Sequence, residues 1–320
     1  MKESENVSLF ITSFYEKKFL KLYFSYFRGK INSTQGFMKK LSITILFFLL
    51  AFCQINAQQA KYVFYFIGDG MGVNQVQGTE LYLGELEGKI GITPLQFTQF
   101  PYTTVATTFS ATNGVTDSAA AGTALATGNK TKNGAIGVLK DLQTPVYSVA
   151  TWAKERGCRV GVATSVSVDH ATPAAFYAHA SGRGSYYEIG KDLYETGFDF
   201  YAGSDFLQPQ DKKNPQAANL YSLADQYGYT IARGYKDYLR KSKKADKMIL
   251  FQPEAASKAD RSSIPYAIDR GKSDLTLQEI TRSAINFLSK DLSKGFFLMV
   301  EGGKIDWLAT AMMPLRPFMK

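Results

Sequence analysis

The feature that most constrains the fold is a series of short apolar runs that alternate with helical patterns along the chain. The clearest run, at 62–67 (YVFYFI), is continuous and ends at Gly68, which predicts a strand buried on both faces of a sheet. Strands separated by helices predict an α/β fold with a largely parallel central sheet and helices on both faces. Such sheets bind their ligands at the carboxyl ends of the strands.

The other expected elements follow from the same patterns. Further strands are expected at 159–165, 198–202, 248–252 and 296–300. Helices are expected at 118–127, 147–155, 173–180, 216–227 and 275–292. The stretches near 208–215 and 254–274 are rich in Lys, Asp and Ser, and we expect surface loops there.

The segment before the first strand has the pattern of an export signal. Met38, Lys39 and Lys40 precede a short apolar run at 43–53 and then Ala57, after which we expect cleavage. Because signals normally begin at the initiator methionine, we expect translation to start at Met38 and residues 1–37 to be an over-extended gene prediction. Signal 38–57 would then deliver a mature chain to the periplasm or the extracellular space, without a stable membrane span.

Composition excludes several classes of protein. The formal net charge is +9, but residues 1–40 hold eight Lys and Arg against three Glu, and the rest is only mildly basic. No Lys/Arg stripe marks a nucleic-acid footprint, so we expect no nucleic-acid partner. The chain has two histidines, His170 and His179, and two cysteines, which together allow neither a histidine-rich metal site nor a disulfide framework.

Two glycine- or alanine-rich segments place reactive side chains at the ends of elements. Asp69 follows the first strand between Gly68 and Gly70, where a carboxylate is a good ligand for a hard cation, although such a turn alone is often just a turn. Ser118 begins the Ala-rich helix after Asp117, so backbone N–H groups there favour an anion such as phosphate. The alternative for Ser118 is a simple helix cap.

Two further segments complete the pattern. His170 and Thr172 follow the strand at 159–165, although the Thr172-Pro173 pair is also typical of a plain helix start. Arg183 lies one helix further on, and arginine binds phosphate with two parallel hydrogen bonds. Glu301 and Asp306 follow the strand at 296–300 and suggest metal ligation. Each segment is weak by itself, whereas four in this order are a strong indication together.

These segments identify a resemblance to the alkaline phosphatase family over residues 61–307. The matching motifs are G-D-G-M-G, T-D-S-A-A-x-G-T-A, H-A-T-P-A-A and V-E-G-G-x-I-D. The resemblance implies an α/β sandwich, a site with two Zn²⁺ ions and one Mg²⁺, and hydrolysis of phosphate monoesters through a phosphoserine. It also implies small-molecule substrates, and a homodimer is common among such relatives.

Metal ligands carry over from the resemblance by position. Asp69 would bridge one zinc and the magnesium, Thr172 and Glu301 would complete the protein ligands of the magnesium, and Asp306 would bind the other zinc. His170 stands at a position near the magnesium where family members have either an acid or a histidine. These assignments are what the resemblance implies.

The catalytic roles carry over in the same way. Ser118 would be the nucleophile, with its alkoxide held by the first zinc. Arg183 would hold the phosphate oxygens, and Asp117 would fix its guanidinium. The physical logic is that a dianionic ester repels nucleophiles until cations neutralise it, and a metal ion replaces the histidine base.

The last residues depart from the family pattern. Thr310 stands where a histidine ligand of zinc is expected, and the chain ends at Lys320 before the remaining ligands. The zinc sets are therefore incomplete, whereas the magnesium set is complete. We expect a one-base deletion near the Trp307 codon, a domain of 58–307, an out-of-frame tail of 308–320, and a poorly stable, nearly inactive chain.

Three alternatives remain open. One is a related sulfatase, phosphodiesterase or phosphomutase with the same metal-binding core. Another is an exported protein that binds phosphate or a metal without catalysis. The third is a secreted α/β protein whose acids at the strand ends are incidental.

Overall fold

The computed structural model describes residues 60–312. The expected export signal and the residues after Met312 lie outside the described part, so the structure does not bear on them. Within 60–312 the strands follow the order β1 (Tyr62–Gly68), β2 (Arg159–Thr164), β3 (Phe200–Gly203), β4 (Tyr229–Arg233), β5 (Lys247–Phe251) and β6 (Phe296–Gly302).

Helices connect these strands. The α-helices are α3 (Val73–Leu86), α4 (Ser118–Thr127), α5 (Val149–Glu155), α6 (Ala171–Ala174), α7 (Tyr186–Thr196), α8 (Leu220–Leu223), α9 (Tyr235–Lys241), α10 (Glu254–Ala259), α11 (Leu277–Leu288) and α12 (Ile305–Met312). Two short 3₁₀ helices are η1 (Gln96–Gln99) and η2 (Asp225–Tyr227). Among the described residues, no helix is both long enough and apolar enough to cross a membrane.

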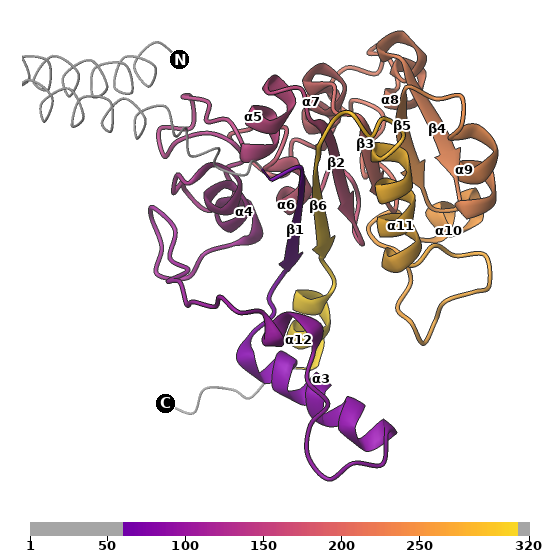
Figure 1. The fold of residues 1–320 in the computed structure, drawn as a ribbon. Coiled ribbons are helices and arrows are strands. Elements are labelled where there is room, and N and C mark those ends of the chain that lie inside the picture. Colours follow the sequence, from indigo (N-terminus) through magenta and orange to yellow (C-terminus); the bar gives the residue numbers. More distant parts are fainter. Residues whose placement is uncertain (1–59, 313–320) are drawn as a thin grey trace, which may run out of the picture. The chain divides into compact units, whose positions relative to one another are not determined.

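The strands form one six-stranded parallel sheet in the order β1-β6-β2-β3-β5-β4 (Figure 1). Strand β6 lies between β1 and β2, and its Glu301 pairs with Ile67 on one side and Thr164 on the other. The carboxyl ends of β1 and β6 point toward α12 and α3 (Figure 1). Because β1, β6 and β2 are parallel neighbours, the three segments that follow them in the sequence lie together at the carboxyl ends of the strands.

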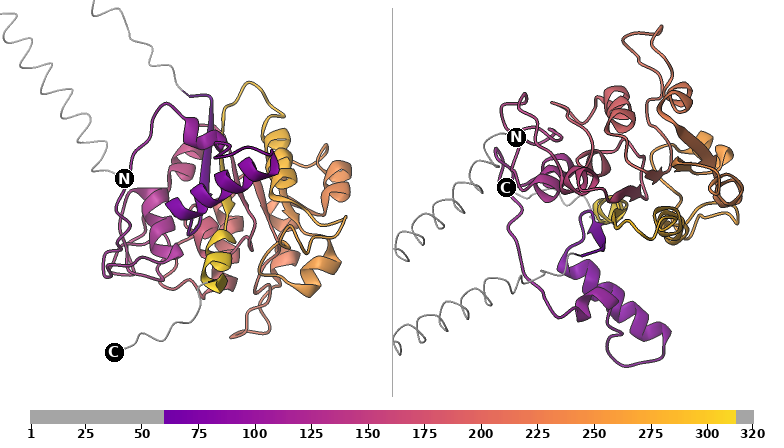
Figure 2. Two further views of the ribbon diagram at one scale, coloured as in Figure 1. Left: turned by 90° about the horizontal axis from the view of Figure 1, so that it is seen from below. Right: turned by 45° about the horizontal axis from the view of Figure 1, so that its top comes forward.

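Side chains that alternate along the strands pack into two hydrophobic clusters, one on each face of the sheet. On β6, Phe297 and Met299 belong to a cluster with α4, α5, α6 and α7, whereas Leu298 and Val300 belong to a cluster with α9 and α11. Figures 1 and 2 show these two groups of helices on opposite sides of the sheet. The prediction of a parallel α/β fold with helices on both faces is therefore confirmed.

The environment predicted for the first strand is wrong. Tyr62, Phe64 and Phe66 of β1 are exposed, by 41%, 42% and 67%. Within 60–312, β1 is an edge strand that pairs only with β6, and no helix of the α11 side covers its outer face. Apolar composition identified the strand correctly, but composition does not reveal whether a neighbouring element covers it.

Several helices differ from the predicted ranges. Helix α6 ends at Ala174, and the helix expected at 216–227 is split into α8 and η2. Helix α10 occupies part of the stretch expected to be a loop, and β4 and helices α3, α7, α9 and α12 were not predicted. Strand β4 (YTIAR) has too few apolar residues to stand out, and it forms because β5 supplies its hydrogen-bonding partner. Helix α12 runs across the expected boundary at residue 307.

Candidate active site

Asp69 and Ser118 meet at the carboxyl end of β1. The Asp69 N–H donates to the carbonyl of Gly302 (3.3 Å), which fixes the turn that follows the strand. The Ser118 hydroxyl donates to Asp69 Oδ2 (2.9 Å). Burial raises the pKa of Asp69, and the nearby Asp306 carboxylate adds to this shift. A serine hydroxyl and a carboxylate that are 49 residues apart in the sequence are thus hydrogen-bonded.

Asp117 links the start of α4 to an arginine. As the N-cap of the helix, its Oδ1 accepts from the Ala120 N–H (3.0 Å), while Oδ2 accepts from the Gly134 N–H (3.1 Å) and Arg183 Nη1 (3.1 Å). Burial alone would raise the pKa of Asp117, but these three donors outweigh it and lower the pKa. Asp117 is therefore a stable anion that caps α4 and orients the guanidinium at the same time.

Arg183 is also held by its backbone and by His170. Its N–H donates to the Gly134 carbonyl (2.7 Å), and Nη2 lies 3.4 Å from Nε2 of His170. Burial and the neighbouring Arg183 charge lower the pKa of His170 to about 4, so the imidazole is neutral near pH 7. The other ring nitrogen of His170, Nδ1, is buried and has no hydrogen-bond partner.

Thr172 and Glu301 lie buried behind this group. Glu301 Oε2 accepts a short hydrogen bond from the Thr164 hydroxyl, while Glu301 Oε1 and Thr172 Oγ1 are buried without a hydrogen-bond partner. Burial raises the pKa of Glu301 to about 7, and the Asp69 carboxylate adds to the shift. Thr172 is close enough to Glu301 to lower that pKa in part, but neither Thr172 Oγ1 nor Glu301 Oε1 makes a hydrogen bond of normal geometry. Two such oxygens beside the Asp69 carboxylate are the arrangement that a bound cation would satisfy.

Asp306 approaches Asp69 because residue 70 is glycine. Gly70 has φ of +67°, and a Cβ atom there would lie 2.6 Å from Cβ of Asp306. Any other residue at position 70 would therefore displace Asp306, which comes from the first turn of α12. The G-D-G sequence serves both the turn after β1 and the contact with this helix.

These residues surround a cavity of about 720 Å³. Its walls include Asp69, Asp117, Ser118, Thr172, Arg183 and Asp306. His170 and Glu301, the other two residues singled out in the sequence, are not part of the wall. His170 contacts Arg183, and the Asp69 charge raises the pKa of Glu301. All eight residues singled out in the sequence are thus in one region of the structure.

Sequence reasoning missed Thr164 and gave Trp307 no role. Thr164 donates to Glu301 from the end of β2, where its position at a strand terminus was the available signal. Trp307 lines the cavity, and its ring lies 5.9 Å from the His170 ring in an edge-on arrangement. Neither residue type points to this chemistry without the fold.

The resemblance implies two kinds of metal ion, Mg²⁺ and Zn²⁺, and the described residues suit one better than the other. Asp69, Thr172 and Glu301 offer oxygen ligands only, two of them buried and unpaired, which suits Mg²⁺. Zinc normally takes three or four protein ligands, often histidine. Among residues 60–312, no group of three or more His, Cys, Asp and Glu lies close enough together to hold a metal ion, so these residues alone do not supply the ligand set that zinc normally takes.

Comparison with known proteins shows similarity to one family, the alkaline phosphatases. A sequence model described as alkaline phosphatase matches residues 60–202 and 208–316. Alkaline phosphatase 3 of Bacillus subtilis is 35% identical over 256 residues, which cover 79% of this chain and 53% of that protein. Alkaline phosphatase 4 of Drosophila melanogaster is 32% identical over 301 residues, with 78% and 49% covered. The chain spans about half the length of these curated relatives.

Solved structures agree with the sequence relatives. The alkaline phosphatase from the Antarctic bacterium TAB5 has a TM-score of 0.66 and 32% identity, covering 78% of this chain and 68% of that one. The Thermus thermophilus alkaline phosphatase has a TM-score of 0.66 and 28% identity, covering 78% and 51%. Variants of the TAB5 enzyme with a histidine replaced by Glu or Asp have Mg bound in a site called M3.

Proposed function

The chain belongs to the alkaline phosphatase family, and from this premise we propose that it hydrolyses phosphate monoesters in the cavity around Ser118. One observation carries the proposal. The Ser118 hydroxyl, bonded to Asp69, lies at the N-terminus of α4 in the same cavity as Arg183, whose guanidinium is fixed by Asp117. A nucleophile, an orienting carboxylate and a cationic binding group are thus assembled around space for a small dianion.

Ser118 would react in two steps. In the first, its Oγ forms a bond to phosphorus while the ester P–O bond breaks, and the alcohol leaves after its oxygen takes up the proton that Ser118 loses. In the second, water attacks the phosphoserine, releases inorganic phosphate and restores the hydroxyl. The hydrogen bond to Asp69 Oδ2 engages the Ser118 proton, so that an Oγ lone pair is available to attack phosphorus.

Arg183 and α4 would neutralise the substrate. Arg183 can donate two parallel hydrogen bonds to phosphate oxygens, and the N-terminus of a ten-residue helix adds its partial positive charge. Asp117 acts as a positioning residue, because it holds Nη1 of Arg183 while capping the same helix. These contacts reduce the repulsion between a dianionic ester and the serine oxygen.

A magnesium ion would be held by Asp69, Thr172 and Glu301. When bound, it would supply positive charge beside Asp69 and satisfy the two unpaired buried oxygens. The Mg bound at the M3 site of the TAB5 variants supports a magnesium site in this family. For zinc, the described residues do not provide a ligand set, and we derive no step through it.

The same observation favours a second candidate, a chain that binds phosphate with little turnover. Arg183 and α4 can bind phosphate without a metal ion, and residues 60–312 hold no group of three or more His, Cys, Asp and Glu that could bind zinc beside Ser118. We expect slow turnover for this chain for that reason. We further propose that it is exported and acts on small phosphate monoesters.

Steady-state hydrolysis of an aryl phosphate, with and without added Mg²⁺, tests the function. We expect slow release of phosphate that is lost in Ser118→Ala and retained in Ser222→Ala, an exposed serine on α8. Phosphate binding without any release of the aryl alcohol would favour the second candidate. Turnover that survives in Ser118→Ala would contradict the assignment of the nucleophile.

A further inference from the structure

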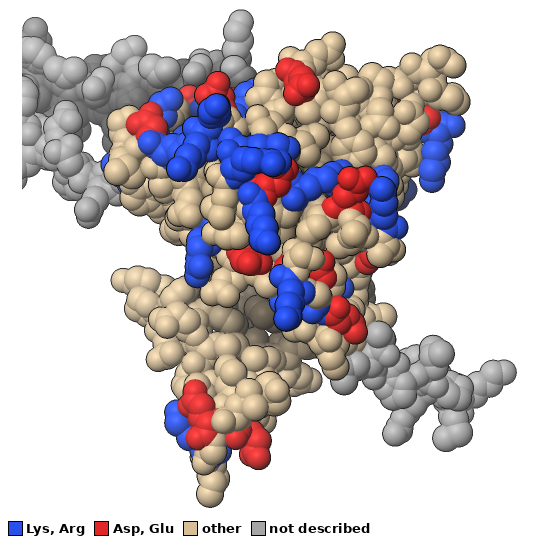
Figure 3. Space-filling view, turned by 90° about the vertical axis from the view of Figure 1, so that its right-hand side faces the viewer, with Lys and Arg blue, Asp and Glu red and all other residues tan. Residues whose placement is uncertain are grey.

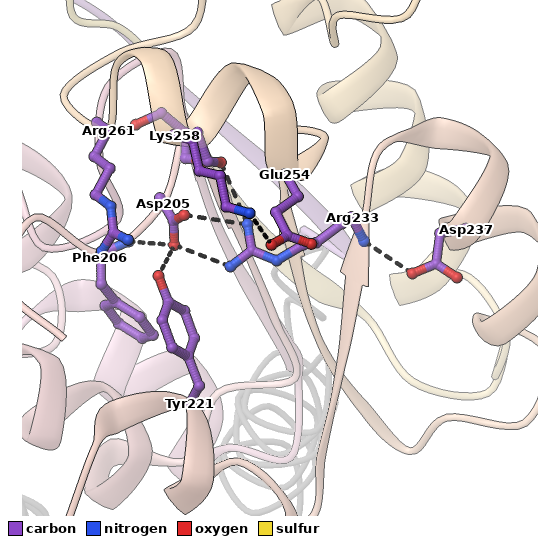
Figure 4. Close-up of polar contacts among 10 residues, drawn as sticks. Asp205, Phe206, Tyr221, Arg233, Asp237, Glu254, Lys258 and Arg261 are labelled. Carbon is purple, nitrogen blue, oxygen red and sulfur yellow. Dashed lines mark hydrogen bonds and ion pairs between the residues drawn. The ribbon is translucent and has the colours of Figure 1, made fainter.

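A second cavity, of about 340 Å³, opens near the carboxyl ends of β3 and β4 and shares no wall residue with the first. Its walls include Asp205, Tyr221, Arg233, Glu254, Lys258 and Arg261 (Figure 4). These side chains come from the loop after β3, helix α8, the end of β4, helix α10 and the loop that follows α10. Nothing in the proposed phosphatase chemistry uses them.

Both carboxylate oxygens of Asp205, at the base of this cavity, accept hydrogen bonds from the protein. Its side chain is only 1% exposed and accepts from the Phe206 N–H (2.9 Å), the Tyr221 hydroxyl (2.6 Å) and Arg233 Nη1 (3.1 Å). Its negative charge is therefore balanced within the protein. A cation entering the cavity would find no free oxygen on this carboxylate.

Arg233 is held in place but keeps free donors. Its guanidinium carbon lies 5.2 Å from the Tyr221 ring and 5.3 Å from the Phe251 ring, and Nη1 also contacts Ser257 Oγ (3.3 Å). Nη2 also donates to Asp205 Oδ1 (3.5 Å), so both terminal nitrogens face this carboxylate. Of the five N–H donors of the guanidinium, Nε–H and one N–H of Nη2 have no partner among the described residues. With its side chain 25% exposed, Arg233 can offer these donors to a ligand without moving.

Lys258 and Arg261 add positive charge to the cavity, and neither is held in a buried ion pair. Lys258 pairs with Glu254 at 2.8 Å, but both side chains are mostly exposed, so this pair is weak and exchangeable. Arg261 has no carboxylate partner among the described residues, and its charge acts on Tyr221 in the cavity wall. Figure 4 shows Arg261 and Arg233 on opposite sides of Asp205.

We propose that this cavity is a second binding site, for a tetrahedral oxyanion of the phosphate or sulfate type. The wall holds three cations and two carboxylates, so its net charge is positive by one unit, carried by Arg261. Arg261, the remaining donors of Arg233 and the exchangeable Lys258 together match an anion with at least three oxygens. A carboxylate needs only one guanidinium fork, and the positive wall disfavours a metal cation. The site does not depend on phosphatase activity and stands apart from the proposed function.

Calorimetric titration of the full chain with inorganic phosphate tests the site. Every protein in the experiment carries Ser118→Ala and Arg183→Gln, so that the first cavity is disabled. We expect about one phosphate bound per chain, and at least a tenfold loss of affinity when Arg261→Gln is added. An Arg261→Lys variant, which keeps the charge but not the fork, should lose less.

A matched control separates the cavity from general surface charge. Lys and Arg are spread over much of the face seen in Figure 3, with Asp and Glu among them. Arg282→Gln, an exposed residue of α11, removes the same charge away from the cavity and should leave the affinity unchanged. Equal losses in Arg261→Gln and Arg282→Gln would overturn the proposal, as would no binding in the parent protein. Acetate competing as well as sulfate would overturn the tetrahedral assignment.

Discussion

At the scale of single residues, two buried oxygen atoms say most about the first cavity. Glu301 Oε1 and Thr172 Oγ1 have no hydrogen-bond partner, and an unsatisfied buried polar group typically costs about 1–3 kcal/mol. A cation between them would recover that free energy, which makes magnesium binding measurable as stabilisation.

Replacement of Glu301 should remove the response to magnesium. We expect millimolar Mg²⁺ to raise the thermal unfolding temperature of the parent protein, and to leave that of Glu301→Gln unchanged, because a neutral amide is a poor ligand. Differential scanning fluorimetry with a magnesium titration measures this. Glu188→Gln, an exposed position on α7, is the control and should respond like the parent. An equal magnesium shift in Glu301→Gln would place the ion elsewhere.

Asp117 should show two separable effects. Asp117→Asn keeps a good helix cap but loses the charge that holds Arg183, so phosphate affinity should fall about tenfold with little loss of stability. Asp117→Ala loses both, and its free energy of unfolding should drop by about a further 1 kcal/mol. Phosphate titration and urea unfolding of the two variants measure these effects. Equal phosphate affinity in Asp117→Asn and the parent would rule out its positioning role.

Part of the candidate site was predictable because three of its residues lie at or after the carboxyl ends of strands. Asp69 and Glu301 stand at the ends of β1 and β6, and Thr172 follows β2 in the chain, so a parallel sheet brings the three together. Thr164 and the Arg261 cavity were not predictable in this way. Their roles depend on which strands are neighbours, and sequence order does not reveal that β2 lies beside β6.

At the scale of elements, a glycine sets the distance between α4 and α6. A Cβ atom on Gly122 would lie 3.2 Å from Cβ of Ala175 and 3.3 Å from Cα of Thr172. Helix α4 carries Ser118, and α6 carries Thr172. The close contact therefore fixes the nucleophile relative to a candidate magnesium ligand.

A larger residue at this contact should weaken both the fold and the site. Gly122→Val inserts two methyl groups and a Cβ where there is no room, so we expect a loss of about 1–3 kcal/mol in unfolding free energy. Gly78→Val in α3 meets nothing within 4 Å and serves as the control for helix propensity. Urea unfolding compares the two. A similar loss in both variants would mean that helix propensity, not the contact with α6, determines the effect.

Element boundaries were predictable where local chemistry determines them. Helix α4 was predicted residue for residue, because Asp117 caps its start and Gly128, with φ of +75°, ends it. Strand β4 was missed because its pairing with β5, and not its own composition, makes it a strand. The buried environment expected for β1 failed for the same reason, since cover is a property of the neighbours.

At the scale of the whole molecule, β1 leaves an apolar edge. Phe66 is 67% exposed and borders a groove with Leu277, Ile285 and Val300. An edge strand with exposed aromatic side chains is a typical site of association between chains. Strand β1 itself (YVFYFIG) contains no charged residue that would oppose such contacts.

A charge on this edge should therefore reduce self-association. We expect the purified chain to form concentration-dependent oligomers, and Phe66→Lys to shift them toward monomer. Sedimentation velocity over a range of concentrations measures the distribution. Ile268→Lys adds the same charge at an exposed apolar residue in a loop and should have little effect. An unchanged distribution in Phe66→Lys would show that association uses another surface.

The central claim is that Ser118, between Asp69 and Arg183, accepts the phosphoryl group. Acid quenching of the chain during reaction with an aryl phosphate, followed by peptide mass spectrometry, tests it most directly. The account predicts a phosphoryl group on Ser118 that is absent from Ser118→Ala and strongly reduced in Arg183→Gln. Hydrolysis with no phosphorylated Ser118, or a phosphoryl group trapped on another residue, would contradict it.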